Sequence, residues 1–238
     1  MDNQNLKFDF VFLGQSVLKY QVPLDIFTAI NQIYEQNYNN LASANQQLVG
    51  KIENEHSLFY NGADQTKMKN HNLLPQNVTD YFMTMFKHYL TFNKIKDYNT
   101  HLNSIWINEM KQHEYNPAHI HTECSMSCVG YLRLPEKIEE EWEEDYKDHY
   151  PANGHIEFLH GSSGKMHQHT LMVKPSVGDF FIFPADLIHM VYPFKSEGER
   201  RSFSMNIEVH QEKLDKEGNA TQIPKAKEGH VAGNFELA

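Results

Sequence analysis

The first third of the chain shows two hydrophobic patterns in succession. Apolar residues occupy every second position around residues 8–12 and 17–22, which predicts strands. Pro23 and Pro75 each precede apolar residues at helical spacing, and proline is common at the first position of a helix. The polar, asparagine-rich residues 40–73 predict a loop with short strands. The second helix should pack on the outside of a sheet through one apolar face, made by Val78, Phe82, Met85, Phe86, Tyr89 and Leu90.

From about residue 103 to 209 the pattern is that of a β-rich domain. Short apolar runs lie between glycine and proline turn signals. Many short strands of this kind indicate a sandwich or barrel. We expect one domain over residues 1–210, in which 1–102 form N-terminal strands and helices and 103–210 the β core, and a polar C-terminal arm over 211–238. The predicted strands are 105–107, 127–134, 156–159, 170–173, 179–183 and 202–209.

An acidic run lies between Pro135 and Pro151. Such a charge run is usually a solvated insertion on the surface. The functional alternative is a mobile lid or partner-binding loop over residues 136–148, with Trp142 as its anchor, because the run leaves the strand that carries Tyr131.

Composition restricts the functional classes. The net charge of −10 argues against a general nucleic-acid binder and against a protein of anionic membrane surfaces. The N-terminus lacks the basic start and apolar stretch of a signal peptide, and runs such as 180–183 are too short to cross a bilayer, so we expect a cytoplasmic protein. Cys124 and Cys128 lie four residues apart, a poor geometry for a disulfide, and are expected to be reduced.

Two separate stretches carry candidate metal ligands. Residues two apart on a strand point to the same face, so His119, His121 and Glu123 project together. A distant third ligand, His189, follows the segment that starts at Gly178. Two histidines and a carboxylate with open positions are the ligand set of non-haem Fe(II) oxygenases.

A strand near the end of the core carries a polar face. Arg200, Ser202, Ser204 and Asn206 alternate with residues that are apolar apart from Arg201. After Glu197-Gly198-Glu199, Arg200 could be a surface turn residue. A buried polar face, however, is costly without a partner, and arginine binds carboxylates in a planar fork. The pattern therefore favours a carboxylate ligand at Arg200.

Four motifs in order resemble the 2-oxoglutarate/Fe(II)-dependent oxygenase superfamily. They are Asn116–His121, Ser127–Leu132, Phe183–His189 and Arg200–Asn206. More narrowly, they are similar to oxygenases of marine bacteria and their phages. The resemblance implies a mainly β double-stranded β-helix (a cupin-like jelly roll) with flanking N-terminal helices. It also implies Fe(II) and O₂, with 2-oxoglutarate as co-substrate.

The resemblance leaves two options for the metal site. The superfamily usually has His-x-Asp or His-x-Glu, which would make His121 and Glu123 ligands; its narrower relatives favour His119 with His121. His121 and His189 are ligands in both options, and His119 or Glu123 completes the set. The resemblance further implies that Arg200 binds the far carboxylate of 2-oxoglutarate, assisted by Tyr131 and by Ser202 or Ser204.

The expected function is an Fe(II)- and 2-oxoglutarate-dependent dioxygenase. It would hydroxylate a C–H bond and release succinate and CO₂. The expected partner is the small-molecule co-substrate; the sequence does not identify the prime substrate and leaves a homodimer open.

The alternative is a cupin-type metal-binding protein or isomerase that does not use 2-oxoglutarate. Cupins share the fold and the paired histidines, but Asp186 stands where their second motif has glycine, and they have no reason for Arg200. A structural or sugar-binding jelly roll, in which the histidines only fill polar space, is the third option.

Overall fold

The computed structural model describes residues 14–45, 49–59, 72–96, 98–144, 151–211, 213–214 and 220–221. The strand expected around residues 8–12 lies outside these ranges, as do residues 145–148 of the acidic run. The C-terminal arm also lies mostly outside them. Its described residues form two short strands, β11 (Lys213–Leu214) and β12 (Ala220–Thr221), which pair antiparallel.

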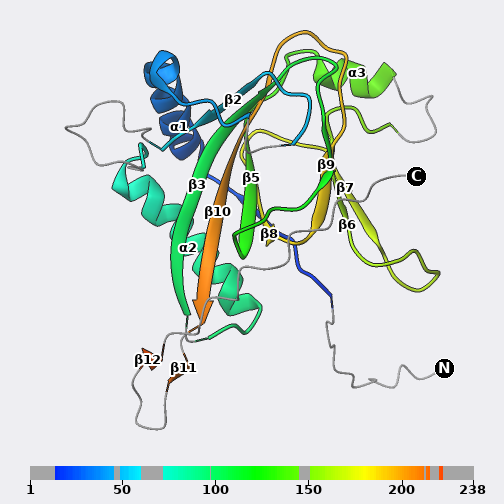
Figure 1. Ribbon diagram of the computed structural model, residues 1–238. Coiled ribbons are helices and arrows are strands. Elements are labelled where there is room, and N and C mark those ends of the chain that lie inside the picture. The colour runs from blue at the N-terminus through cyan, green and yellow to red at the C-terminus, as the bar shows by residue number, and fades with distance from the viewer. Residues whose placement is uncertain are drawn as a thin grey trace, which may run out of the picture.

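Two antiparallel sheets face each other (Figure 1). The chain passes repeatedly from one sheet to the other, which makes the double-stranded β-helix that the sequence predicted. The larger sheet has the order β1 (Leu18–Gln21), β8 (Asp179–Pro184), β5 (Met126–Arg133), β10 (Arg200–Gln211), β3 (Tyr98–Met110) and β2 (Asn54–Ser57). The smaller sheet has the order β4 (Asn116–His119), β9 (Ile188–Val191), β6 (Ile156–Leu159) and β7 (Thr170–Val173).

Both predicted helices form and cover the outer face of the larger sheet (Figure 1). Helix α1 (Leu24–Asn37) begins after Pro23, and α2 (Gln76–Phe92) begins after Pro75; the 3₁₀ helix η1 (Tyr38–Asn40) follows α1. The apolar stripe of α2 is buried as expected. Its Phe82 ring lies 5.0 Å from Phe180 of β8 and 5.1 Å from Phe203 of β10.

These contacts determine what faces the interior of the barrel. Side chains alternate along a strand, so a strand that turns Phe203 toward α2 must turn Ser202 and Ser204 toward the other sheet. On β8 the same rule places Phe181 and Phe183 inside, where they join a second apolar cluster with Tyr131 and Phe158. The interior is therefore apolar along β8 and β6 and polar along β10.

The acidic run contains a packed helix, α3 (Ile138–Glu144), and the solvated interpretation is wrong for part of it. Ile138 and Trp142 are buried in the cluster between the sheets. Trp142 Nε1 donates a 2.6 Å hydrogen bond to the carbonyl of Asn153, and Glu141 accepts backbone hydrogen bonds from Lys195 and Ser196. The run is amphipathic, because these residues face the core while most of its other carboxylates face water. The lid alternative remains a prediction for the end of the run.

Replacing Trp142 should measure how firmly α3 is anchored. We expect Trp142→Ala to lower the free energy of unfolding by about 3 kcal/mol, because it removes a buried ring and one of the hydrogen bonds to the Asn153 carbonyl. Urea unfolding followed by circular dichroism measures the change. Glu139→Ala, on the exposed side of the same helix, is the control and should change stability by less than ~0.5 kcal/mol. An unchanged midpoint for Trp142→Ala would mean that α3 is not packed in solution.

Within the described residues, no helix combines the length and the apolarity needed to cross a bilayer.

Candidate active site

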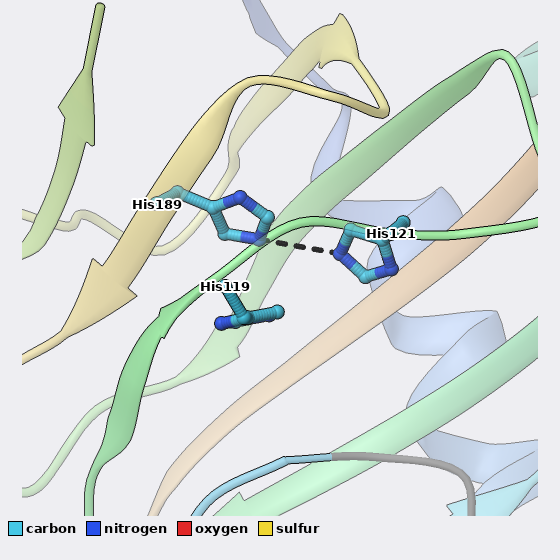
Figure 2. Close-up of side chains that lie close together, drawn as sticks. All are labelled: His119, His121 and His189. Atoms are coloured by element: carbon cyan, nitrogen blue, oxygen red, sulfur yellow. Dashed lines mark hydrogen bonds between the residues drawn. The ribbon is translucent and has the colours of Figure 1, made fainter. Parts of the chain in front are cut away.

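Three histidines from two adjacent strands meet at one end of the barrel (Figure 2). His119 ends β4 and is the cross-strand partner of His189 on β9, and His121 lies just beyond the end of β4. One ring nitrogen from each of the three lies within 4.8 Å of the other two. The rings of His119 and His189 are 4.3 Å apart, and those of His121 and His189 are 5.0 Å apart.

Hydrogen bonds orient two of these rings. His119 Nδ1 lies 2.7 Å from the carbonyl oxygen of Pro117, and His189 Nδ1 lies 2.9 Å from that of Leu187. A carbonyl oxygen can only accept, so each Nδ1 carries the proton and each Nε2 keeps a free lone pair. A metal-binding histidine is normally held in this way by a second partner.

The histidines are neutral at physiological pH. Burial, followed by the neighbouring histidines, lowers the pKa of His189 to about 3. Burial and the neighbouring His119 lower the pKa of His121 to about 4, and burial also lowers the pKa of His119. A neutral imidazole is the form that binds a metal, so protons do not compete for this site near neutral pH.

The spacing of the His121 and His189 nitrogens fits two ligands of a single metal ion. His121 Nε2 and His189 Nε2 lie 3.2 Å apart. Two nitrogens that each lie about 2.1 Å from one ion are roughly 3 Å apart when the ligand–metal–ligand angle is near 90°. Imidazole suits iron among other transition metals, and three ligands from one side leave the opposite side open. The residues present therefore fit Fe(II).

Of the two options that the sequence left open, the structure brings His119 and not Glu123 to this group. Strand β4 ends at His119, so the alternation that would have aligned Glu123 with the histidines stops there. Glu123 has a positive φ of 59°, and its side chain is exposed. Its carbonyl accepts a 2.8 Å hydrogen bond from Asn103 Nδ2, which holds the backbone in this turn.

Aromatic side chains hold the histidines in place. The Trp106 ring on β3 lies 5.7 Å from His121, and the rings of Phe183 and Phe158 lie 4.8 Å and 6.1 Å from His189. These contacts cover the faces and edges of the imidazoles that do not face the metal position, and so restrict their rotation and exclude water.

Arg200 is a buried cation that has no anionic partner among the described residues. It is only 3% exposed, and its guanidinium carbon lies 4.8 Å above the Tyr131 ring. Nε donates a 3.1 Å hydrogen bond to the carbonyl of Gly154, whereas Nη2 has no partner among the described residues. Burial lowers the pKa of Arg200. A buried charge of this kind is costly unless an anion pairs with it.

The adjacent Arg201 shows the opposite arrangement on the outer face of β10. It forms ion pairs with Glu109 at 3.0 Å, Glu199 at 2.7 Å and Glu35 at 3.0 Å. Despite the opposing effect of burial, these carboxylates raise the pKa of Arg201. Arg201 is therefore neutralised by the protein itself, and only Arg200 needs an external anion.

Of the other predicted co-substrate residues, Tyr131 and Ser202 lie next to Arg200, whereas Ser204 lies four residues from Arg200 along β10. Tyr131 and Ser202 are cross-strand partners on β5 and β10, and Ser202 and Ser204 line the same cavity as the histidines. The Tyr131 hydroxyl is buried and has no hydrogen-bond partner among the described residues. Burial raises its pKa to about 12, so it remains a neutral donor. This polar group can accommodate one carboxylate.

The cavity has a volume of about 450 Å³, within the usual range for small-molecule sites. It also has a polar wall that the sequence analysis missed, made by Glu55, Asn108 and Asn116. Glu55 lies on a four-residue strand within the polar region 40–73, and only its pairing with β3 turns it toward the site. No pattern along the sequence indicates that pairing, although Asn116 lies inside one of the four motifs.

The comparisons with known proteins agree with this arrangement. Among solved structures, a prolyl-4-hydroxylase of Pseudomonas putida is 14% identical, with 82% of this chain and 92% of that chain covered and a TM-score of 0.50. A prolyl hydroxylase of Trichoplax adhaerens, solved with a hypoxia-inducible-factor peptide, is 10% identical, with 82% and 83% covered and a TM-score of 0.51. AviO1 of Streptomyces viridochromogenes is 12% identical, with 82% and 90% covered and a TM-score of 0.50. At these identities the likeness establishes the fold.

The sequence of the core is similar to that of a known family. Fold and site together define a 2-oxoglutarate/Fe(II)-dependent dioxygenase. Residues 104–206, which include the three histidines and Arg200, match the family described as "Putative 2OG-Fe(II) oxygenase". The family implies Fe(II), 2-oxoglutarate and O₂. No curated protein matches the sequence closely enough to count as a relative.

Proposed function

We propose that this oxygenase is a hydroxylase that inserts oxygen into a C–H bond of its prime substrate and releases succinate and CO₂. The observation that carries the proposal is Arg200, a buried cation with an unpartnered Nη2 in the same cavity as three neutral histidines. This pairing suits a molecule that chelates a metal at one end and carries a carboxylate at the other. 2-Oxoglutarate has both features.

Each group of residues then has a defined task. His119, His121 and His189 would hold Fe(II) through their Nε2 atoms, with the Nδ1 protons of His119 and His189 fixed by backbone carbonyls. The bound iron, together with 2-oxoglutarate and O₂, supplies the oxidising chemistry of the superfamily. Arg200 would bind the far carboxylate in a planar fork. Tyr131 and Ser202, which are cross-strand partners next to Arg200, would donate hydrogen bonds to the same carboxylate.

The surrounding residues would exclude water from the site and hold the Arg200 guanidinium in place. Phe158 and Phe183 line the histidines on one side, and Trp106 lies against His121 on the other. Their rings exclude water, which strengthens the electrostatic interactions of Arg200 and limits side reactions. Gly154 contributes its carbonyl to Arg200 Nε and so fixes the guanidinium before a ligand arrives.

The proposal is tested in two steps. Anaerobic addition of Fe(II) and 2-oxoglutarate should produce the visible charge-transfer band of a chelated keto acid. In air, the same mixture should convert 2-oxoglutarate to succinate, and a substrate pool that contains the prime substrate should accelerate this conversion and yield a product heavier by one oxygen atom. Mass spectrometry of the products measures that addition. A metal-binding protein that forms no such band would instead be of the cupin type.

A further inference from the structure

The cavity has a second polar region, distinct from the proposed iron and co-substrate groups. Strand register places Glu55 of β2 beside Asn108 of β3, and Asn108 beside Ser202 of β10. Cross-strand partners lie on the same face of a sheet, so all three face the cavity. Asn116, the first residue of β4, lines the cavity from the smaller sheet. We call Glu55, Asn108 and Asn116 the acceptor wall.

Each residue of the acceptor wall has a buried oxygen without a partner. Glu55 Oε1, Asn108 Oδ1 and Asn116 Oδ1 accept no hydrogen bond from the described residues. Glu55 is only 3% exposed and Asn108 only 7%. Buried polar atoms in proteins are nearly always hydrogen-bonded, so unpartnered atoms that line a cavity indicate a ligand.

Nearby Glu114 shows what a structural carboxylate looks like in this part of the fold. It is buried too, but its two oxygens accept backbone hydrogen bonds from Glu53 at 3.0 Å and Lys111 at 2.6 Å. Glu55 makes no ion pair with any described residue, and the three residues of the wall have no such backbone donors for the oxygens named above. The described part of the chain therefore gives these oxygens of the acceptor wall no structural partner.

The charge of the ligand expected at the acceptor wall follows from Glu55 and its neighbour Glu114. An asparagine amide can present either its oxygen or its nitrogen, so the carboxylate determines the preferred ligand. Burial, followed by the charge of Glu114, raises the pKa of Glu55 to about 7. A cation at this position would offset the repulsion between the two carboxylates and restore the charged form of Glu55, whereas an anion would add to the repulsion.

The acceptor wall lies apart from Arg200. Arg200 of β10 pairs with Met110 of β3, whereas Glu55 of β2 pairs with Asn108 of β3. Glu55 therefore lies two strands away from Arg200 and is displaced from it by two residues along the strand direction. This register corresponds to a separation on the order of 12 Å between the two backbone positions. Trp106, the next inward residue of β3 after Asn108, contacts His121. A molecule bound at the acceptor wall would therefore extend toward the histidines without entering the Arg200 region.

We propose that Glu55, Asn108 and Asn116 bind a protonated amine of the prime substrate, so that the substrate is an amine-bearing molecule. The amine can belong to a free amino acid or polyamine, or to a lysine side chain of a peptide. This inference rests on the proposed oxygenase function, because it assigns the second substrate of the same cavity. It divides the cavity between a cationic end for the co-substrate and an anionic end for the substrate.

Matched pairs of ligands test the charge requirement directly. The probes are cadaverine, L-lysine and a short peptide with one lysine, each beside its fully N-acetylated counterpart. Binding is measured by calorimetry with the anaerobic Fe(II) and 2-oxoglutarate complex, and again with the metal-free protein. We expect at least one amine to bind at least ~10-fold more tightly than its acetylated counterpart. Preference for the free amines indicates a small-molecule substrate, and preference for the peptide indicates a protein substrate.

Two variants assign the preference to the wall. Glu55→Gln keeps the shape of the side chain but removes its charge, and should abolish the preference. Asn108→Leu is an independent second variant with the same expected direction. Glu53→Gln, two residues away on the exposed side, is the matched control and should keep the preference. The affinity of each variant for 2-oxoglutarate reports whether its site is intact.

The outcomes separate this inference from the proposed function. Equal binding of every amine and its acetylated counterpart, or an unchanged preference in Glu55→Gln, would overturn the amine assignment. A protein that binds iron but no 2-oxoglutarate would overturn the oxygenase proposal instead, and the metal-free titration would still decide the amine assignment.

Discussion

Arg200→Met is expected to weaken 2-oxoglutarate binding about 100-fold while Fe(II) binding stays nearly normal. A hydrogen bond to a charged group contributes about 1.5–3 kcal/mol, and the guanidinium can offer two such bonds to one carboxylate. Nε already donates to the Gly154 carbonyl, so the loss falls on the Nη groups, of which Nη2 has no partner among the described residues. Titration of the visible band with 2-oxoglutarate measures its affinity. A metal competition assay measures Fe(II) affinity separately.

The stability of the ligand-free protein provides a second result for the same variant. Within the described part of the chain Arg200 is a buried charge without a counter-ion, and its replacement by an apolar side chain of similar length removes the cost of burying that charge. We therefore expect the ligand-free Arg200→Met protein to unfold at the same or a higher temperature than the wild type. A catalytic residue often shows this combination of lost function and retained stability.

The choice of control follows from the two faces of β10. Arg201 faces away from the cavity, as the alternation predicted, but its pairs with Glu109 and Glu199 hold the outer face together. Arg201→Met should lower stability, since it removes the ion pair of the buried Glu109 carboxylate. Arg133→Ala, at a half-exposed arginine on β5, is the better control for co-substrate binding. Normal 2-oxoglutarate affinity in Arg200→Met would show that another group binds the carboxylate.

Much of the fold follows from local patterns in the sequence. Six of the strands and both long helices lie close to their predicted residues, because each element shows its own periodicity between clear turn signals. Strand β9 was not predicted as a strand, and the stretch of β4 was expected to continue as a strand to Glu123, although β4 ends at His119. Each has only four residues, and their polar histidines interrupt the apolar alternation. The candidate metal-binding histidines thus weakened the hydrophobic pattern of the two strands on which they lie.

Site residues could be predicted where the alternation along one strand places them. They could not be predicted where their position depends on the pairing of two strands. The polar face of β10 and the order of the four motifs led to Arg200, Ser202 and His189. Glu55 depends on the pairing of β2 with β3, which is a tertiary event. The choice between His119 and Glu123 depends on where β4 ends, and strand ends are the least predictable feature of a sequence.

His119→Ala is expected to lower Fe(II) affinity at least ~100-fold, whereas Glu123→Ala should change it less than about threefold. His119 points at the metal position with its Nδ1 proton held by Pro117, and Glu123 is exposed outside the group. His121→Ala and His189→Ala should behave like His119→Ala. Competition with a coloured chelator measures affinity under anaerobic conditions. If Glu123→Ala causes the loss and His119→Ala does not, the chain rearranges around iron into the two-histidine, one-carboxylate form.

A carboxylate substitution distinguishes a ligand from a merely structural histidine. The superfamily pattern His-x-Asp would be recreated by His121→Asp, with His119 as the preceding histidine. We expect His121→Asp to bind Fe(II) within about tenfold of the wild type, in contrast to His121→Ala, because a carboxylate oxygen can replace an imidazole nitrogen as a ligand. Loss of iron in both variants would instead assign His121 a packing role against Trp106. Three neutral ligands also leave the full charge of the ion at the site, so His121→Asp should bind the dianionic co-substrate more weakly than the wild type does.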